Sequence, residues 1–373
     1  MRCLRSCSST RTAKRRFDTW DYSQKNRSPK NCWSCQINSP RTKPIIGITI
    51  GDPAGIGPEI VLKALSDGEV TKRCLPVVIG HAGLLRRCVE SIDLAGVDVE
   101  VISSPMAAKG RNAIEVIHVE AAGMLDIRPG ELSADAGGAS DLFLRKACEL
   151  GLAGEIDAFA TAPINKEALR LAGIPHIGHT EMLAAYLNVE DSPLTLFLTG
   201  NMRIFFLSRH LSLRGAIDYI TADRVCEFIR RVHFAMTEFG FANPRIGLAA
   251  LNPHASDGGQ FGDEERIHLL PAAEQARAEG IDVSSPIGAD SVFNMAVEGK
   301  FDCVISLYHD QGHIAAKTRD FHGTVTATLG LPVLRTSVDH GTAFDIAWKG
   351  AANSISMKMA TLAAVDLLSK KRI

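Results

Sequence analysis

The stretch IIGITIGDPAGIGPE, residues 45–59, decides the fold class of this chain. Its first six residues suit a short buried strand, and the turn rich in glycine and proline that follows leads into an apolar-periodic helix that ends near Leu65. A strand, a tight turn and a helix in this order begin a β-α-β unit. The stretch therefore predicts an α/β protein.

Outside this stretch, short β-rich runs continue to alternate with amphipathic helices, and no internal repeat occurs. We expect further strands at Leu75–Ile79, Val97–Ile102, Ala113–His118, Ile156–Ala160, Leu194–Leu198, Ile204–Leu207, Arg245–Ala250 and Phe301–Ser306. We expect the clearest helices at Asp141–Leu152, Glu181–Leu187, Ala222–Phe239, Glu264–Glu279 and Ile355–Leu368. This order predicts a largely parallel sheet with helices between its strands.

The composition fits a globular protein of balanced charge. The chain has 373 residues, 46% of them hydrophobic, and its 41 basic and 42 acidic residues leave a net charge of −1. Such a balance gives no field that recruits nucleic acid or an anionic membrane. Because no apolar run could span a bilayer and no secretory signal opens the sequence, we expect a cytoplasmic protein without membrane or nucleic-acid partners.

Residues 1–43 differ from the rest of the chain. They are rich in Arg, Lys, Ser and Asn, contain only Asp18 and Asp21 as acids, and show no apolar periodicity. This composition predicts a disordered basic extension. An organellar transit peptide or a misassigned translation start would have a similar composition, and the sequence leaves these alternatives open.

The nine cysteines indicate little chemistry. The four in the basic extension have irregular spacing and make a poor zinc pattern: Cys3, Cys7, Cys32 and Cys35. The other five stand singly in apolar or helical contexts, where a buried reduced cysteine is ordinary: Cys74, Cys88, Cys148, Cys226 and Cys303.

Motif placement predicts two α/β domains after the extension, since no low-complexity linker marks a boundary. The first domain is expected to comprise residues 44–171 together with residues 340–373. The second, residues 172–339, holds most of the candidate metal and substrate residues.

Four histidines lie in polar segments that follow predicted strands: His179 in GHTE, His210 in SRH, His254 in NPH and His309 in YHDQGH. Such segments meet at the ligand crevice of an open α/β sheet, where neutral imidazoles can bind a divalent ion. We expect these segments to be loops, so no helical His-x-x-x-His pair is predicted. The spacing is therefore a weak signal, and any one of these histidines could be a surface or hydrogen-bonding residue.

Basic residues follow some of the same strands. Lys317 and Arg335 come after the His309 segment and would suit a phosphate or carboxylate, whereas Lys166 in TAPINK is either a ligand contact or a solvated residue at a helix start.

The turn at 51–59 lacks the full G-x-G-x-x-G pattern, and Pro58 removes a backbone donor. A structural turn and a direct ligand role remain equally open for it.

Seven motifs occur together in one order: GITIGDPAGIGPE, TAPINKEAL, GHTE, SRHLSLR, LNPHASDGGQFGDEE, YHDQGH and LGLPVLRTSVDHGTAFDIA. In these motifs the chain resembles the 4-hydroxythreonine-4-phosphate dehydrogenase (PdxA) family from about Pro44 to the C-terminus. The segment YHDQGHIAAK is also similar to the branch of that family that acts on 4-phospho-D-threonate or 4-phospho-D-erythronate.

The resemblance implies roles for particular residues. It implies divalent-metal ligands at His210, His254 and His309, and acidic residues near the reacting centre at Asp290 and Asp310. It implies substrate contacts at His179, Thr180, Lys317, Thr326 and Arg335. It implies cofactor contacts within residues 329–345, for which we take Gly330, Leu331, Asp339, His340 and Thr342.

The resemblance also implies the fold and the assembly. The family has the two-domain fold of isocitrate and isopropylmalate dehydrogenases, with the active site in the cleft between domains and at a dimer interface. An obligate homodimer is therefore expected, with NAD held by loops instead of a G-x-G-x-x-G turn. The ion is expected to be zinc, magnesium, cobalt or manganese.

The reaction that the resemblance implies is oxidation and decarboxylation of a small phosphorylated hydroxy acid. The first expectation is 4-phosphohydroxy-L-threonine, converted to 3-amino-2-oxopropyl phosphate in pyridoxal phosphate biosynthesis. The alternative is the same chemistry on 4-phospho-D-threonate or 4-phospho-D-erythronate, because Thr326 stands where the vitamin B6 enzyme has asparagine.

Other classes of protein remain to be weighed against a dehydrogenase. A non-catalytic binding module on the same fold is disfavoured by the joint presence of the three histidines with Lys317 and Arg335. A metal-dependent hydrolase or an acyltransferase would need no nicotinamide, so NAD binding discriminates it. Nucleic-acid binding would rest on the basic extension alone.

Overall fold

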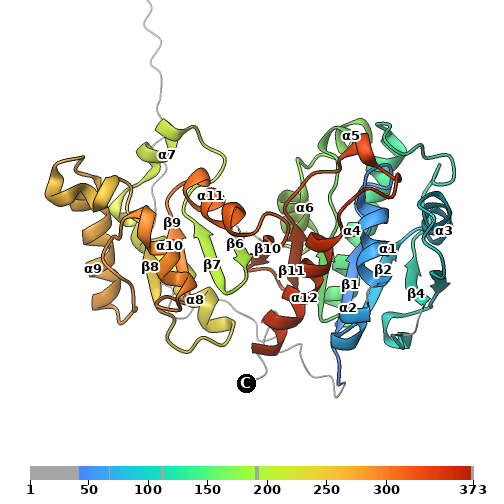
Figure 1. The fold of residues 1–373 in the computed structure, drawn as a ribbon, viewed down its shortest axis with the longest axis horizontal. Coiled ribbons are helices and arrows are strands. Elements are labelled where there is room, and N and C mark those ends of the chain that lie inside the picture. The colour runs from blue at the N-terminus through green and yellow to red at the C-terminus, as the bar shows by residue number, and fades with distance from the viewer. Residues whose placement is uncertain (1–41, 67, 111–112, 190–192, 371–373) are drawn as a thin grey trace, which may run out of the picture.

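The computed structural model describes residues 42–370, apart from residues 67, 111–112 and 190–192 (Figure 1). The predicted disordered extension falls almost wholly on residues 1–41, outside the described residues. An 11-stranded sheet has the order β3-β4-β2-β1-β5-β11-β10-β6-β7-β9-β8. Of ten strand pairings, seven are parallel and three antiparallel. The predicted α/β class with a largely parallel sheet is confirmed.

The strands are short, and most lie close to the predicted positions. They are β1 Ile45–Thr49, β2 Leu75–Gly80, β3 Asp98–Val101, β4 Ala113–His118, β5 Ala158–Thr161, β6 Leu194–Thr199, β7 Met202–Phe206, β8 Ile246–Leu248, β9 Cys303–Ser306, β10 Val325–Leu329 and β11 Leu334–Val338. Figure 1 shows β10 and β11 in the middle of the molecule, between the two halves of the sheet.

Helices alternate with these strands. They are α1 Gly57–Ser66, α2 Gly68–Arg73, α3 Ala82–Ser91, α4 Ala134–Leu152, α5 Lys166–Leu171, α6 His179–Tyr186, α7 Leu213–Tyr219, α8 Ala222–Glu238, α9 Leu270–Ala278, α10 Ala289–Val297, α11 His309–Arg319 and α12 Ile355–Lys370. A π-helical turn, Glu265–Leu269, precedes α9, and short 3-10 turns occur at Pro105–Ala107, Pro253–Gly259 and Phe344–Ile346.

Two elements near the site differ from the prediction. The stretch 329–345, expected to be a cofactor loop, contains β11, which pairs with β5 on one side and β10 on the other. The YHDQGH segment, expected to be a loop, begins helix α11, so His309 and His313 do form a helical His-x-x-x-His pair. The reason is tertiary packing, which overrides weak local propensity in both segments.

The turn between β1 and α1 is tied to two later parts of the chain. Gly51 has a φ of +66°, and a Cβ on it would lie 2.2 Å from the carbonyl oxygen of Pro163. The amide of Ile56 donates to the carbonyl oxygen of Thr342 at 3.0 Å. The glycine-rich turn therefore connects the carboxyl ends of β1, β5 and β11, which is the structural role left open by the sequence.

Asp52 in this turn is a buried carboxylate. Its Oδ1 accepts a hydrogen bond from the Ala54 amide at 2.8 Å, whereas Oδ2 has no hydrogen-bond partner among the described residues. Burial raises the pKa of Asp52 to about 6. The folded protein therefore holds this proton more tightly than the unfolded chain does.

Replacing Asp52 with asparagine should make stability less dependent on pH. Because the folded pKa exceeds the unfolded value, the wild type loses stability as pH rises toward and through 6. From about pH 5 to about pH 7, the unfolding free energy of Asp52→Asn should gain about 1 to 2 kcal/mol relative to wild type. Urea unfolding at several pH values measures it, with the exposed Asp218→Asn as control. A difference that stays constant with pH would contradict the prediction.

Two further expectations concern the core and membrane. The five cysteines predicted to be reduced and buried, Cys74, Cys88, Cys148, Cys226 and Cys303, are free and buried. Among the described helices none has the length and apolar character needed to cross a bilayer. The predicted domain boundaries stay a proposal, because one sheet passes through both halves.

Candidate active site

Arg335 lies on β11 and is only 7% exposed. Its Nε and Nη2 donate to Thr161 Oγ1 at 3.0 and 2.7 Å, and its Nη1 donates to Thr328 Oγ1 at 3.1 Å. No described carboxylate forms an ion pair with it. Burial lowers the pKa of Arg335 to about 9, which leaves the guanidinium charged at neutral pH. A buried cation with only hydroxyl partners is costly, so the site favours an anionic ligand as its counter-charge.

His179 begins helix α6 and lies near this guanidinium. Its Nε2 is covered and has no hydrogen-bond partner among the described residues. Burial, together with the charge of Arg335, holds the pKa of His179 well below its usual range. A neutral imidazole with an unused nitrogen, beside a buried cation, can add a hydrogen bond to an anion. Thr180 follows it in the first turn of α6.

Thr326 lies on the same part of the sheet. On β10, Thr328 is the cross-strand neighbour of Arg335, and Thr326 is that of Ser337. Residues two apart on a strand share a face, so Thr326 lies on the face of Arg335 and Thr328. Thr326 is buried, and its hydroxyl is 3.5 Å from the Ser337 carbonyl oxygen.

His210 lies near both His309 and Lys166. His210 is an exposed residue, but part of its imidazole is shielded from solvent, and this shielding lowers its pKa. The nearby Arg209, His309 and Lys166 lower the pKa further. A Cβ on Gly178 would lie 3.8 Å from Lys166 Cε, so the beginnings of α5 and α6 lie close together. The ring centroids of His210 and His309 are 6.1 Å apart. His210 and His309 thus come together from distant parts of the sequence.

His309 carries its proton on the nitrogen that faces Asp310. Its Nδ1 lies 2.7 Å from Asp310 Oδ1, and because an ionised carboxylate can only accept, Nδ1 must be the donor. The lone pair of a neutral imidazole is then on Nε2. A carboxylate on the far nitrogen is the arrangement found behind histidines that bind metals. The donor chemistry of His309 therefore fits a divalent ion.

His254 and Asp290 both lie beside Gly288. His254 lies in the turn Pro253–Gly259 with a φ of +51°, and a Cβ on Gly288 would lie 3.7 Å from the His254 Cα and 2.5 Å from Asp290 Oδ1. In the described residues, the only group of three or more possible metal ligands within 4.8 Å of one another is a different one. A single chain thus does not assemble the three predicted ligands at bonding distance.

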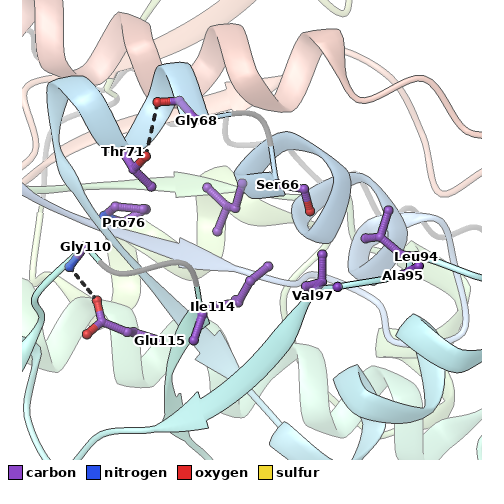
Figure 2. Close-up of a pocket in the computed structure, with 13 residues that line it drawn as sticks. Ser66, Gly68, Thr71, Pro76, Leu94, Ala95, Val97, Gly110, Ile114 and Glu115 are labelled. Atoms are coloured by element: carbon purple, nitrogen blue, oxygen red, sulfur yellow. Dashed lines mark hydrogen bonds between the residues drawn. The ribbon is translucent and has the colours of Figure 1, made fainter.

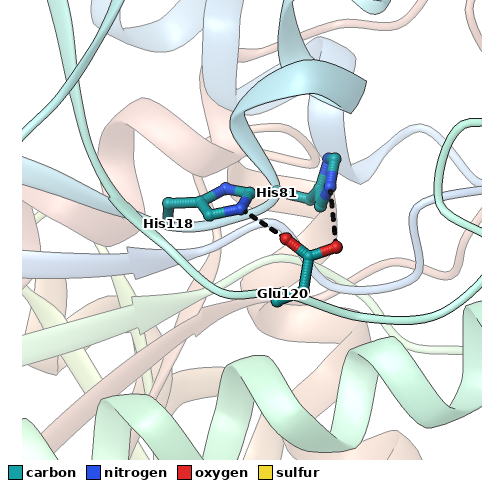
Figure 3. A group of neighbouring side chains, drawn as sticks. All are labelled: His81, His118 and Glu120. Carbon is teal, nitrogen blue, oxygen red and sulfur yellow. Dashed lines mark hydrogen bonds and ion pairs between the residues drawn. The ribbon is translucent and has the colours of Figure 1, made fainter.

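That different group is His81, His118 and Glu120, shown in Figure 3. His81 Nδ1 accepts from the Leu84 amide and His118 Nδ1 accepts from the Ala82 amide, both at 3.1 Å. Each neutral ring must then carry its proton on Nε2, and His118 Nε2 lies 2.9 Å from Glu120 Oε2. The Nδ1 lone pairs accept these hydrogen bonds and Nε2 carries the proton, so neither ring offers a free lone pair to a metal ion.

The predicted cofactor residues fall into two places. Asp339, His340 and Thr342 follow β11, where Lys317 Nζ contacts Asp339 Oδ2 at 2.6 Å and its carbonyl oxygen at 2.9 Å. Gly330 and Leu331 precede β11, at its other end, and a five-residue strand separates the two ends by roughly 16 Å. Leu331 is buried in the core beside Val333. The structure thus brings Asp339, His340 and Thr342 together, without Gly330 and Leu331.

The described cavities lie elsewhere. One of about 360 Å³ is lined by residues of α1, α2, β2 and β4 and their loops, including Leu65, Thr71, Ile114 and Glu115 (Figure 2). The Glu115 carboxylate accepts hydrogen bonds from the Lys109 and Gly110 amides and stabilises the bend there. None of the predicted site residues lines this cavity.

The fold and this arrangement define an α/β protein with a buried cationic site suited to an anion. The chain belongs to the PdxA family, since the family model described as pyridoxal phosphate biosynthetic protein PdxA matches residues 72–364. The predicted family resemblance is confirmed. Membership implies NAD and a divalent metal ion as cofactors.

Similar proteins carry two different names. A Clostridium botulinum (strain Hall) protein provisionally named D-threonate 4-phosphate dehydrogenase is 46% identical over 331 residues, covering 88% of this chain and 98% of that protein. A Symbiobacterium thermophilum protein of the same provisional name is 47% identical over 320 residues, 86% of this chain and 95% of that one. The crystal structure of 4-hydroxythreonine-4-phosphate dehydrogenase from Klebsiella pneumoniae is 40% identical, covers 87% and 99% of the two chains, and has a TM-score of 0.81.

Sequence reasoning missed three residues of this region. Thr161 begins the quoted motif TAPINKEAL and Thr328 directly precedes the last motif, but nothing in the sequence shows that they are the hydrogen-bond partners of Arg335. His313 was passed over because its segment was expected to be a loop. Its four-residue spacing from His309 was the available signal.

Proposed function

We propose that this chain catalyses the NAD- and divalent-metal-dependent oxidation and decarboxylation of D-threonate 4-phosphate. The observation that carries the proposal is Arg335, a buried guanidinium without a described counter-charge, beside the unpartnered Nε2 of His179. A phosphate with two negative charges supplies that counter-charge. The name of the 46%-identical relative supports the substrate.

The second candidate is 4-phosphohydroxy-L-threonine, supported by the name of the 40%-identical solved structure. The two substrates differ at the carbon next to the carboxylate, which bears a hydroxyl in one and an amino group in the other. Thr326 lies on the face of Arg335, and its side chain is a candidate for sensing this difference. D-erythronate 4-phosphate, a stereoisomer, is a third substrate to compare.

The chain's own residues have distinct tasks in this proposal. Arg335, His179 and Thr180 bind the anionic group, and Lys317 on α11 is a candidate for a further substrate contact. His210, His254 and His309 would hold the ion, while Asp310 keeps the His309 proton on Nδ1. Asp290 and Asp310 are candidates to accept the hydroxyl proton as hydride leaves. When bound, the ion supplies Lewis acidity that eases loss of this proton and then departure of carbon dioxide.

Two further expectations belong to this proposal. In the described residues, His210, His254 and His309 do not form a group within 4.8 Å of one another, as expected if a homodimer completes the site. NAD would bind at Asp339, His340 and Thr342, with Gly330 and Leu331 as more remote candidates.

Light scattering of the purified protein measures whether the expected homodimer forms, and a monomer at working concentration would contradict the dimer.

Purified protein should form NADH faster with D-threonate 4-phosphate than with the other two substrates. A difference of one hydrogen-bonding group in a polar site predicts a kcat/KM ratio of at least about 10. NADH absorbance measures the rate with each substrate at saturating NAD and a divalent ion, and a chelator control should abolish it. A preference for the L-threonine derivative would support the second candidate, and no NADH with any of them would contradict the proposed dehydrogenase.

A further inference from the structure

The imidazole of His313 lies flat against that of His309. The two residues are four apart on α11, and their ring centroids are 3.6 Å apart with planes inclined by only 11°. His313 Nδ1 lies 2.8 Å from the backbone carbonyl oxygen of His309, to which it must donate because a carbonyl can only accept. His313 is thereby fixed both in position and in tautomer.

Two aromatic side chains of the sheet also pack against the His313 ring. Phe197 on β6 and Phe206 on β7 contact its ring with centroids at 4.3 and 4.7 Å. Gly312 permits this approach, since a Cβ on it would lie 2.5 Å from Phe206 Cε1. The helix therefore packs tightly on the strands, and His313 has little freedom to rotate away from His309.

We propose that His313 is a positioning residue that fixes the His309 imidazole for the divalent ion. This inference rests on the metal role of His309 in the proposed function. Asp310 accepts a hydrogen bond from Nδ1 at the ring edge and His313 covers the ring face, so Nε2 is left to face the ion. A ring held by both contacts loses less rotational freedom when an ion binds.

Removing the stack should weaken metal binding by about 10- to 100-fold, the range typical of residues behind a metal ligand. His313→Leu removes the aromatic face and the donor at similar volume. His313→Gln keeps a donor without the face, and His313→Phe keeps the face without the donor. If stacking is the main contribution, Leu and Gln should weaken binding, and Phe should restore it to within about 3-fold of wild type.

The experiment titrates full-length metal-free protein with Zn²⁺ and Co²⁺ against a chromophoric chelator. The visible absorption of bound Co²⁺ reports ligand geometry, and urea unfolding of the metal-free variants reports stability. A merely structural role would lower stability without changing metal affinity or the Co²⁺ spectrum. Using both Leu and Gln keeps the test decisive if one of them folds poorly. His118→Gln, in the separate cluster of Figure 3, is the control and should leave affinity unchanged.

The outcomes separate this inference from the proposed function. In one outcome, wild type binds the ion, His309→Asn loses it, and both His313→Leu and His313→Gln keep full affinity. The positioning role of His313 would then be wrong, while the proposed metal site would stand. If His118→Gln loses the ion instead, or wild type binds none, the proposed metal site fails and the inference fails with it.

Discussion

Arg335→Met should lose substrate binding while its folded state stays as stable as that of the wild type or becomes more stable. The guanidinium is buried and has only the hydroxyls of Thr161 and Thr328 as described partners. Replacing an uncompensated buried charge with an apolar side chain of similar length removes a desolvation cost. The bound anion, in contrast, loses its counter-charge, at about 3 to 5 kcal/mol of binding free energy. Affinity should fall by between about 100-fold and several thousand-fold.

Calorimetric titration with substrate and urea unfolding of the ligand-free protein measure the two effects. Arg335→Lys should recover part of the affinity, because it keeps the charge without the planar fork. Arg203→Met is the matched control: it also removes an arginine whose pKa is lowered by burial, on β7, and it should leave substrate affinity unchanged. Wild-type affinity in Arg335→Met would show that the guanidinium is structural, as would a marked loss of stability.

The sequence identified Arg335 and His179 as candidate substrate contacts, but it did not predict that Arg335 would be buried without a described counter-charge. A family resemblance points to individual positions and does not show which side chains surround them. The surroundings of Arg335 depend on which side chains two neighbouring strands bring to it, Thr161 from β5 and Thr328 from β10. Such pairings are non-local, and no local pattern in the sequence encodes them.

The central strands β10 and β11 were missed for a related reason. Each has five residues, and β10 reads VTATL, a short alternation of apolar residues with threonine that was overlooked. Their neighbours stabilise them, since β10 pairs with β6 and β11 pairs with β5. The first strand, its turn and α1 were predicted correctly because their signal is local: an apolar run, a glycine-rich turn and a helical period.

Helix α11 was not predicted because its packing requires a residue that disfavours helices. Its sequence HDQGHIAAKTR has weak amphipathic character and contains Gly312, a residue that disfavours helices. In the fold the same glycine permits the close approach to Phe206. The residue that argued against a helix is thus the one that lets this helix pack, and with the helix unrecognised, the stack of His313 on His309 was not foreseen.

His254→Asn should abolish metal-dependent turnover while leaving the fold intact, because it removes one of the three proposed ligands. Asparagine is the suitable replacement since His254 has a φ of +51°, a conformation that asparagine tolerates better than most residues. His254→Ala should have the same effect on turnover with some added backbone strain. Several kcal/mol of transition-state stabilisation depend on the ion, so the rate should fall by on the order of 1,000-fold or more.

Metal content after dialysis, NADH formation and urea unfolding test this prediction together. Ala255→Asn is the matched control, since Ala255 has the same left-handed conformation in the same turn, with a φ of +54°, and has no proposed ligand role. It should keep both the ion and turnover, which separates loss of the imidazole from disturbance of the turn. Full turnover with bound metal in His254→Asn would show that the ion is held without it, and the three-histidine assignment would have to be abandoned.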